Sequence, residues 1–268
     1  MKSPLFEGCT ALVTGASSGI GKCFARELAQ RGVNLIVSAR SKDELEKLAD
    51  ELRQQFRVSV HVIVSDLAMP GAARQLFAEI QSRKLSVDFL INNAGFGKWA
   101  HFLGERLETY DQMLSLNIDS LVQLTYLFLP NMLAQKRGGV INVASIAAFQ
   151  PLPYIAVYGA SKTFVLSLTE ALAGEYRNTG VRFLALCPGN TVTNFSTVAN
   201  ADTTGMPYST PEYVVKSALD AFAKNKNYHV PGLGNFLTAQ LPRLLPRCLI
   251  IKIVARMFAN RVRGISST

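Results

Sequence analysis

The sequence predicts a doubly wound α/β domain, with one parallel sheet of about seven strands and helices on both faces. Short apolar runs alternate with helical patterns along the chain, the order expected when a crossover helix follows each strand. The chain has 268 residues, of which 49% are hydrophobic and 18% charged, which suits one domain with a large core. No internal repeat or low-complexity linker divides it.

The strands are predicted from short apolar runs bounded by polar residues or glycine. They lie near residues 10–14, 34–39, 58–65, 87–92, 139–145, 181–187 and 227–230. Ligands of parallel sheets bind outside the carboxyl ends of the strands, so the residues at these ends are expected to share one edge. These residues are Gly15, Arg40, Asp66, Asn93, Ser145 and Pro188.

The first strand leads into a glycine-rich turn and then a helical pattern over residues 22–31. The turn is Thr14-Gly15-Ala16-Ser17-Ser18-Gly19-Ile20-Gly21. Glycine permits positive φ and close backbone approach, and a helix start offers unpaired N–H groups to a pyrophosphate. Its Gly-x-x-x-Gly-x-Gly spacing differs from the commonest dinucleotide fingerprint, so a tight strand-to-helix turn without a ligand is the structural alternative.

Tyr158 and Lys162 lie four residues apart in a helical pattern and therefore share a face. An ammonium group beside the phenol favours its ionised form, which would lower the tyrosine pKa from about 10 toward neutral pH. Ser145, thirteen residues earlier, can hold a substrate oxygen. Tyr154 has no lysine four residues later, so the pairing favours Tyr158. A solvated ion pair on a helix surface is the alternative for an isolated Tyr-x-x-x-Lys.

Six motifs in register over roughly residues 6–231 resemble the short-chain dehydrogenase/reductase family. They are Thr14 to Gly21, Asn92-Asn93-Ala94-Gly95, Asn117, Ser145, Tyr158 with Lys162, and Pro188-Gly189. The resemblance implies an oxidoreductase acting on a CH–OH group, with a dinucleotide at the carboxyl edge of the sheet. It also implies homodimers or homotetramers formed through helices that correspond to residues 108–136 and 155–178.

The resemblance implies the roles of the site residues. Tyr158 is the acid/base, Ser145 polarises the carbonyl, and Lys162 tunes Tyr158 and holds the nicotinamide ribose. Asn117 bends its helix and holds a water of the proton relay, and Asp66 accepts a hydrogen bond from the adenine amino group, although it could instead cap a helix starting near Pro70. The implied cofactor-binding residues are Gly15, Ser17, Ser18, Gly19, Ile20, Gly21, Arg40, Asp66, Leu67, Asn93, Ala94, Gly95, Tyr158, Lys162, Pro188, Gly189, Thr191 and Thr193, with Thr191 where the family usually has an aliphatic residue.

The end of the second strand favours NADP(H) over NAD(H). No acidic residue stands there to bind a ribose 2′-hydroxyl, and Arg40 offers a forked cation to a 2′-phosphate. As an alternative, Arg40 could pair with Asp43 or Glu44 on the next helix. Some NADP-preferring family members also have a basic residue in the glycine turn, where this chain has Ser18.

Residues 190–210 are polar, contain Gly205 and Pro207, and follow Pro188-Gly189, so we interpret them as a mobile substrate lid. Aromatic and aliphatic residues in nearby segments predict an apolar ketone or aldehyde, such as a fatty-acyl, steroid-like or aromatic carbonyl compound. These residues are Phe96, Trp99, Phe102, Phe149, Leu152, Tyr154 and Phe195. Two other hypotheses are a small polar or sugar-like carbonyl substrate and a non-catalytic dinucleotide-sensing scaffold, which has no need of an intact Asn, Ser, Tyr and Lys set.

The C-terminal part carries the excess positive charge. Eight of the 28 Lys and Arg residues lie between 221 and 268, where there is no Asp or Glu. From Pro246 onward the pattern is helical, with Lys252, Arg256, Asn260 and Arg263 on one narrow face beside a wide apolar arc. We expect residues 1–231 to form the dehydrogenase domain and 232–268 an amphipathic extension. The extension could pack over the substrate pocket, contact another subunit or rest on an anionic membrane. Its dispersed basic residues do not favour nucleic-acid binding.

The cysteines and histidines show no metal-ligand spacing, so no metal site is predicted. We expect the four cysteines to be buried thiols in a reducing compartment. Residues 1–8 lack an apolar signal-peptide core, and no stretch reaches the ~18 apolar residues of a spanning helix. The prediction is a cytoplasmic protein, with peripheral membrane contact through the tail as an option.

Overall fold

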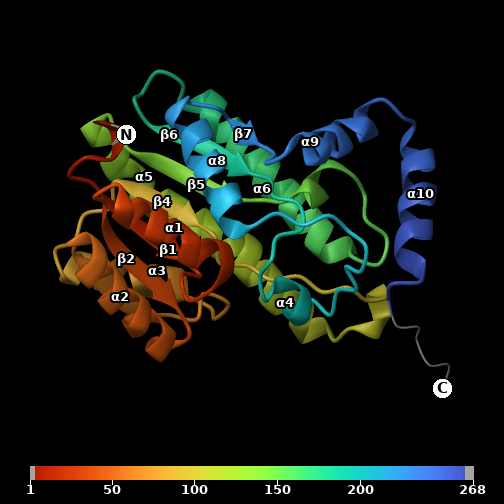
Figure 1. The fold of residues 1–268 in the computed structure, drawn as a ribbon, viewed down its shortest axis with the longest axis horizontal. Coiled ribbons are helices and arrows are strands. Elements are labelled where there is room, and N and C mark those ends of the chain that lie inside the picture. The colour runs from red at the N-terminus through yellow and green to blue at the C-terminus, as the bar shows by residue number, and fades with distance from the viewer. Residues whose placement is uncertain (1–3, 263–268) are drawn as a thin grey trace.

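One seven-stranded parallel sheet organises the chain in the computed structural model, which describes residues 4–262 (Figure 1). The strands lie in the order β3-β2-β1-β4-β5-β6-β7. This confirms the predicted fold class and all seven strands. Their bounds are β1 Thr10–Thr14, β2 Asn34–Ala39, β3 Val60–Val64, β4 Phe89–Asn92, β5 Gly139–Val143, β6 Arg182–Leu186 and β7 Tyr228–His229.

Helices cover both faces of the sheet. On one face lie α1 (Gly19–Gln30), α2 (Lys42–Phe56) and α8 (Pro211–Ala223), and on the other lie α3 (Ala72–Ser82), α5 (Ser120–Gln135) and α6 (Ala156–Glu175). Side chains alternate along each strand, so β1 sends Ala11 and Val13 into the first layer and Leu12 into the second. Two apolar cores therefore hold the sheet between them.

Shorter elements connect the layers or follow the sheet. They are the 3₁₀ turns η1 (Pro4–Phe6), η2 (Phe102–Gly104), η4 (Ile146–Phe149) and η5 (Leu241–Arg243), the π-helical turn η3 (Ser115–Asp119), and the helices α4 (Leu107–Leu114), α7 (Phe195–Val198), α9 (Leu233–Gln240) and α10 (Arg247–Ala259). The helix predicted from Pro246 onward is α10, whereas α9 was not predicted. Arg263, expected on the basic face, lies outside the described residues.

A buried chain of polar side chains crosses the middle of the sheet. Asn92 on β4 donates to Thr125 Oγ1 on α5 (3.1 Å) and to Asn142 Oδ1 on β5 (2.9 Å). Asn142 in turn donates to Thr169 Oγ1 on α6 at 2.9 Å. All four residues are buried, so each bond replaces water that the interior excludes. The chain fixes α5 and α6 against β4 and β5.

The cysteine prediction is only partly right. Cys9, Cys23 and Cys187 are buried free thiols, and burial raises the pKa of the last two to about 12. Cys248 is exposed, because it lies on the side of α10 that faces away from the body. Among residues 4–262, no helix is both long and apolar enough to span a bilayer.

We predict that Asn142→Ala lowers the free energy of unfolding by about 2–4 kcal/mol, because it leaves the Asn92 amide and the Thr169 hydroxyl without their shared partner. Urea titration followed by circular dichroism measures the change. Asn131→Ala, on an exposed part of α5, is the matched control and should change stability by less than about 0.5 kcal/mol. Equal effects of the two substitutions would show that the buried chain contributes nothing.

Candidate active site

The predicted site residues meet at the carboxyl edge of the sheet. Gly15, Arg40, Asp66, Asn93, Ser145 and Pro188 each follow the end of a strand by one or two residues. All six of these strands are parallel neighbours, β1 to β6, so their ends lie along one edge. The structure thus brings together residues that are up to 173 positions apart in the sequence.

The glycine-rich turn requires glycine at three positions. Gly15 and Gly19 have φ of +64° and +52°, in the left-handed region that favours glycine. A Cβ on Gly21 would lie 2.3 Å from the Gly15 carbonyl oxygen, and one on Gly19 would lie 3.0 Å from Thr193 Cγ2. The start of α1 therefore packs closely against the Gly15 backbone and against Thr193. The backbone N–H groups at this helix start could bind a pyrophosphate.

Thr14 ties this turn to the loop after β4. Its Oγ1 donates to the Ile91 carbonyl at 3.2 Å and accepts from the backbone N–H groups of Asn93 and Ala94 at 3.0 Å each. The Asn93 side chain donates back to the Thr14 carbonyl at 2.9 Å. Thr14 stands in the sequence motif but was not predicted as a site residue. Its position directly before Gly15, at the end of a buried strand, is the signal that could have identified it.

Tyr158 and Lys162 lie one turn apart on α6, as predicted. Lys162 is buried, and its Nζ lies 5.8 Å from the centre of the Tyr158 ring. The same Nζ donates to the Val143 carbonyl at 2.8 Å, which anchors α6 to the end of β5. Ser145 follows two residues later, accepts from the Ala147 N–H at 3.1 Å and has its Oγ 3.5 Å from the Pro188 carbonyl oxygen. Ser145, Tyr158 and Lys162 therefore converge.

Asn117 lies in the π-helical turn η3 between α4 and α5, consistent with the bend expected there. Its Oδ1 accepts from the Phe96 N–H at 3.1 Å, and its Nδ2 donates to the Phe96 carbonyl at 3.0 Å and to Ser161 Oγ at 3.1 Å. Ser161 in turn donates to the Tyr158 carbonyl at 2.7 Å. The buried amide therefore connects the loop after β4 to the helix that carries Tyr158.

The pKa of Tyr158 moves opposite to our expectation from the sequence. The side chain as a whole is partly exposed, yet its phenol group is surrounded by protein. Burial raises the pKa of Tyr158 to about 12, against a hydrogen bond to the Ser145 side chain that lowers it. Burial also lowers the pKa of Lys162 to about 8. In this arrangement Tyr158 is a protonated phenol at neutral pH, the form that donates a proton.

The residues expected at the adenosine end lie at the edge near β2 and β3. Asp66 Oδ1 accepts from the Ala68 N–H at 3.1 Å, so it stabilises its own turn and does not cap α3, which starts after Gly71. Arg40 is exposed. Within residues 4–262 it forms neither of the ion pairs that were its alternative role, with Asp43 or Glu44. Its guanidinium is therefore open to a ligand.

The segment after β6 runs along the same edge. The Pro188 carbonyl accepts from the Ile146 N–H at 3.0 Å, and Thr193 Oγ1 accepts from the Phe195 N–H at 3.2 Å. A hollow of about 260 Å³ lies between this segment and α1, with Gly19, Lys22 and Thr193 in its wall. Two of the residues predicted to bind a dinucleotide, Gly19 and Thr193, thus face each other across this hollow.

An apolar cluster packs against Tyr158. Its members, here called the pocket cluster, are Trp99, Ala147, Leu152, Ile155, Ala199, Ile250, Val254 and Val262, with Tyr154, Tyr158, Phe195, Ala201, Met206, Leu245 and Phe258 packed against them. Four of the predicted wall residues belong to it: Trp99, Leu152, Tyr154 and Phe195. Phe149 packs in another core cluster, and Phe102 is exposed and stacks on Tyr110. The sequence pattern around Phe102 and Phe149 does not indicate that one is exposed and the other packs in a core.

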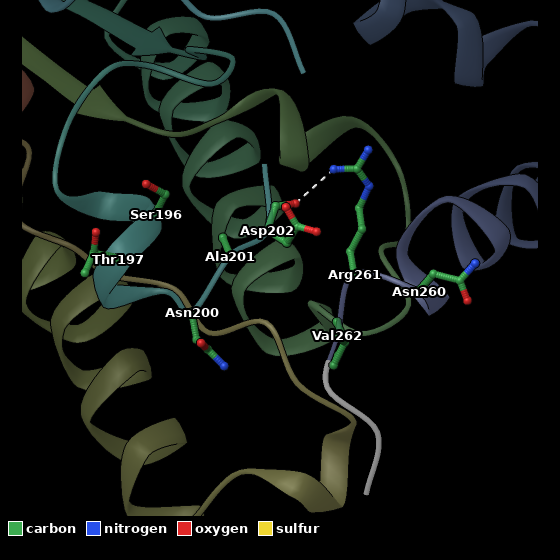
Figure 2. A pocket seen from close by; sticks show the side chains of 8 residues that line it. All are labelled: Ser196, Thr197, Asn200, Ala201, Asp202, Asn260, Arg261 and Val262. Carbon is green, nitrogen blue, oxygen red and sulfur yellow. Dashed lines mark hydrogen bonds between the residues drawn. The ribbon is translucent and has the colours of Figure 1, made fainter. Parts of the chain in front are cut away.

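The inward side of α10 completes the pocket cluster. Phe258 contacts Trp99 edge to face, with ring centres 4.9 Å apart. After the helix, Arg261 Nη1 donates to the Asp202 carbonyl oxygen at 2.9 Å (Figure 2). It also donates to the Thr204 carbonyl oxygen at 3.0 Å, and the two bonds hold the end of the chain against the 190–210 segment. A cavity of about 490 Å³ lies between that segment and residues 260–262, and the four catalytic candidates do not line it.

Comparison with known proteins identifies the family. The model of the short chain dehydrogenase family matches residues 9–204. The chain is 33% identical over 218 residues to a very-long-chain 3-oxoacyl-CoA reductase of Anas platyrhynchos, covering 79% of this chain and 68% of that protein. It is 28% identical over 218 residues to a 7beta-hydroxysteroid dehydrogenase of Mediterraneibacter gnavus, covering 80% and 82%.

A solved structure agrees with this assignment. The short-chain dehydrogenase from Sphingobium yanoikuyae, in complex with NADPH, superposes with a TM-score of 0.81 at 28% identity, over 97% of this chain and 98% of that one. Sequence, sheet order and site geometry thus agree, and the chain belongs to the short-chain dehydrogenase/reductase family of oxidoreductases.

Proposed function

We propose that this enzyme reduces an apolar ketone or aldehyde to the alcohol with NADPH as the cofactor. The proposal rests on the position of Tyr158, which lies beside Ser145 and Lys162 and packs against the apolar pocket cluster. A polar group that borders apolar side chains suits a substrate with one carbonyl and an apolar remainder. When bound, NADPH supplies the hydride.

The chain's own residues position and protonate the carbonyl. Ser145 donates a hydrogen bond to the substrate oxygen, and Tyr158 gives its phenolic proton to the alkoxide as it develops. The Lys162 ammonium, held by the Val143 carbonyl, stabilises the phenolate that remains. Asn117 holds the helix of Tyr158 in place through Phe96 and Ser161, and supports the return of a proton from solvent.

The cofactor preference rests on Arg40. It is exposed at the end of β2, without an acidic partner among the described residues, and its forked guanidinium matches the 2′-phosphate of NADPH. The similar Sphingobium yanoikuyae structure contains NADPH. NAD(H) would lack that contact, so we expect it to bind more weakly.

The substrate class rests on the composition of the pocket cluster and on its relatives. Two relatives are named for 3-oxoacyl-CoA and for 7beta-hydroxysteroids, which both carry large apolar parts. The side chains that pack around Tyr158, among them Trp99, Ile155 and Phe195, are apolar and offer no hydrogen-bonding partner to a small polar carbonyl. An apolar chain or ring system is therefore the better fit.

We further propose an arrangement in cells. Residues 1–231 form the catalytic domain with residues 190–210 as the substrate lid, and an extension begins at residue 232, whose helix α10 packs against the pocket cluster through Ile250 and Val254. Exposed apolar side chains on α4, α5 and α6, among them Leu107, Tyr126 and Phe164, support a homodimer or homotetramer through these helices. Four free thiols fit the cytoplasm.

We predict that Tyr158→Phe lowers kcat for ketone reduction by at least about 100-fold, because it removes the proton donor. The dissociation constant for NADPH, measured by fluorescence titration, should stay within about threefold, since the ring is retained. Undiminished turnover in the variant would show that Tyr158 is not the proton donor.

We predict that KM of the unaltered enzyme falls as the chain of the ketone lengthens, measured with ketones of graded chain length. A KM that does not change with chain length would exclude the apolar substrate class.

We predict that Arg40→Ala raises KM for NADPH by about 10- to 100-fold, the range expected when a charge-assisted hydrogen bond to phosphate is lost. KM for NADH should change little. Arg74→Ala, another exposed arginine on α3, serves as the control. A parallel rise of KM for both cofactors, or none for NADPH, would contradict the role of Arg40.

We predict that kcat/KM for reduction is level below pH 8 and falls as the pH rises through about 8, where Lys162 loses its proton. The active form is the protonated one, so activity is present below this pKa and lost above it. In Lys162→Arg the guanidinium stays charged, and the fall should move to higher pH at a lower overall rate. A fall at an unchanged pH in that variant would assign the titration to another group.

A further inference from the structure

The outward side of α9, η5 and α10 is an exposed surface that is both apolar and basic, here called the tail surface. Residues 233–257 carry nine large apolar side chains that are between 39% and 79% exposed, including Leu237, Leu241, Leu249, Ile251, Ile253 and Met257. Single exposed apolar residues are ordinary, but a concentration within 25 successive residues marks an interaction surface.

The helix α10 binds the body of the protein with only one of its sides. Ile250 and Val254 are buried, and Phe258, one turn further on, packs with them in the pocket cluster. Leu249, Ile253 and Met257 form a second i,i+4 row, which is exposed. In Figure 1, α10 is the outermost element at the right-hand end of the molecule, and no other described element covers its outer side.

The charge of the tail surface favours one kind of partner. Arg243, Arg247, Lys252 and Arg256 are exposed among the apolar side chains, and none of them forms an ion pair within residues 4–262. Residues 221–268 contain no Asp or Glu. A symmetric contact between two copies would place this cationic surface against itself, and like charges repel. An anionic surface attracts it.

We propose that the tail surface docks the enzyme on an anionic lipid bilayer, with α10 lying in the interface. Leucine, isoleucine and methionine side chains enter the boundary between headgroups and acyl chains, while the long Lys and Arg side chains reach the headgroups. The described helices are unable to span a bilayer, so the contact is peripheral.

In this arrangement, α10 lies between the bilayer and the pocket cluster. The same helix borders the bilayer with Leu249 and Ile253 and borders the pocket cluster with Ile250 and Val254. An apolar substrate that is dissolved in the bilayer therefore reaches Tyr158 over a short distance without crossing bulk water. This consequence rests on the proposed substrate class, whereas the docking itself does not.

Vesicle co-sedimentation of the full chain tests the docking. We expect strong binding to vesicles of phosphatidylcholine mixed with phosphatidylglycerol, weak binding to phosphatidylcholine alone, and loss of the difference at high salt. Leu249→Gln with Ile253→Gln should weaken binding by about tenfold or more, because two exposed apolar side chains that would enter the bilayer are lost. Lys252→Gln with Arg256→Gln should weaken binding to the anionic vesicles by a similar factor.

The control pair is Val64→Gln with Met69→Gln, which removes two exposed apolar side chains at the β3 edge of the sheet and should leave vesicle binding unchanged. Circular dichroism confirms that each variant is folded. Absence of binding to anionic vesicles, or equal binding by all variants, overturns the proposal. So does a smaller oligomer for Leu249→Gln with Ile253→Gln in light scattering, which would make the tail surface a subunit contact. Vesicle binding needs no turnover, so its failure leaves the proposed reaction standing.

Discussion

The buried ammonium of Lys162 and the Val143 carbonyl form the contact on which the site depends. A buried charge is costly unless it is hydrogen-bonded, and Lys162 Nζ donates to the Val143 carbonyl oxygen at the end of β5, 2.8 Å away. The bond sets how α6 lies along the sheet, which in turn brings Tyr158 beside Ser145. In the sequence, this geometry corresponds to thirteen residues from Ser145 to Tyr158 and four from Tyr158 to Lys162.

The burial of Tyr158 and Lys162 shifts their pKa values in opposite directions. Exclusion of water raises the pKa of Tyr158 to about 12 and lowers that of Lys162 to about 8, because each charged form is destabilised. A neutral phenol beside a largely protonated lysine at neutral pH is suited to carbonyl reduction. Our expectation from the sequence considered the attraction of positive charges, from Lys162 and from an oxidised nicotinamide, for the phenolate. It missed the burial, which depends on the pocket cluster that four separate segments assemble.

The fold and the meeting of the candidate catalytic residues at one edge of the sheet could largely be predicted from the sequence, because local signals encode them. Strands of a buried parallel sheet are mostly apolar, and the polar residues at their ends mark the edge. By contrast, α9, the Arg261 bonds to the 190–210 segment and the exposure of Cys248 depend on tertiary packing. Phe149 and Phe102 look alike in sequence, yet one packs in the core and the other lies in solvent. Short-range patterns do not distinguish such positions.

The most direct test of the account is to follow the transferred hydrogen. NADPH carrying deuterium at the reactive position of the nicotinamide is incubated with the enzyme and a long-chain ketone, and the alcohol is analysed by mass spectrometry. We expect an alcohol with one deuterium at the former carbonyl carbon, formed by the unaltered enzyme and not by Tyr158→Phe. Bound NADPH without transfer to any apolar ketone, together with transfer to a small polar carbonyl, would contradict it.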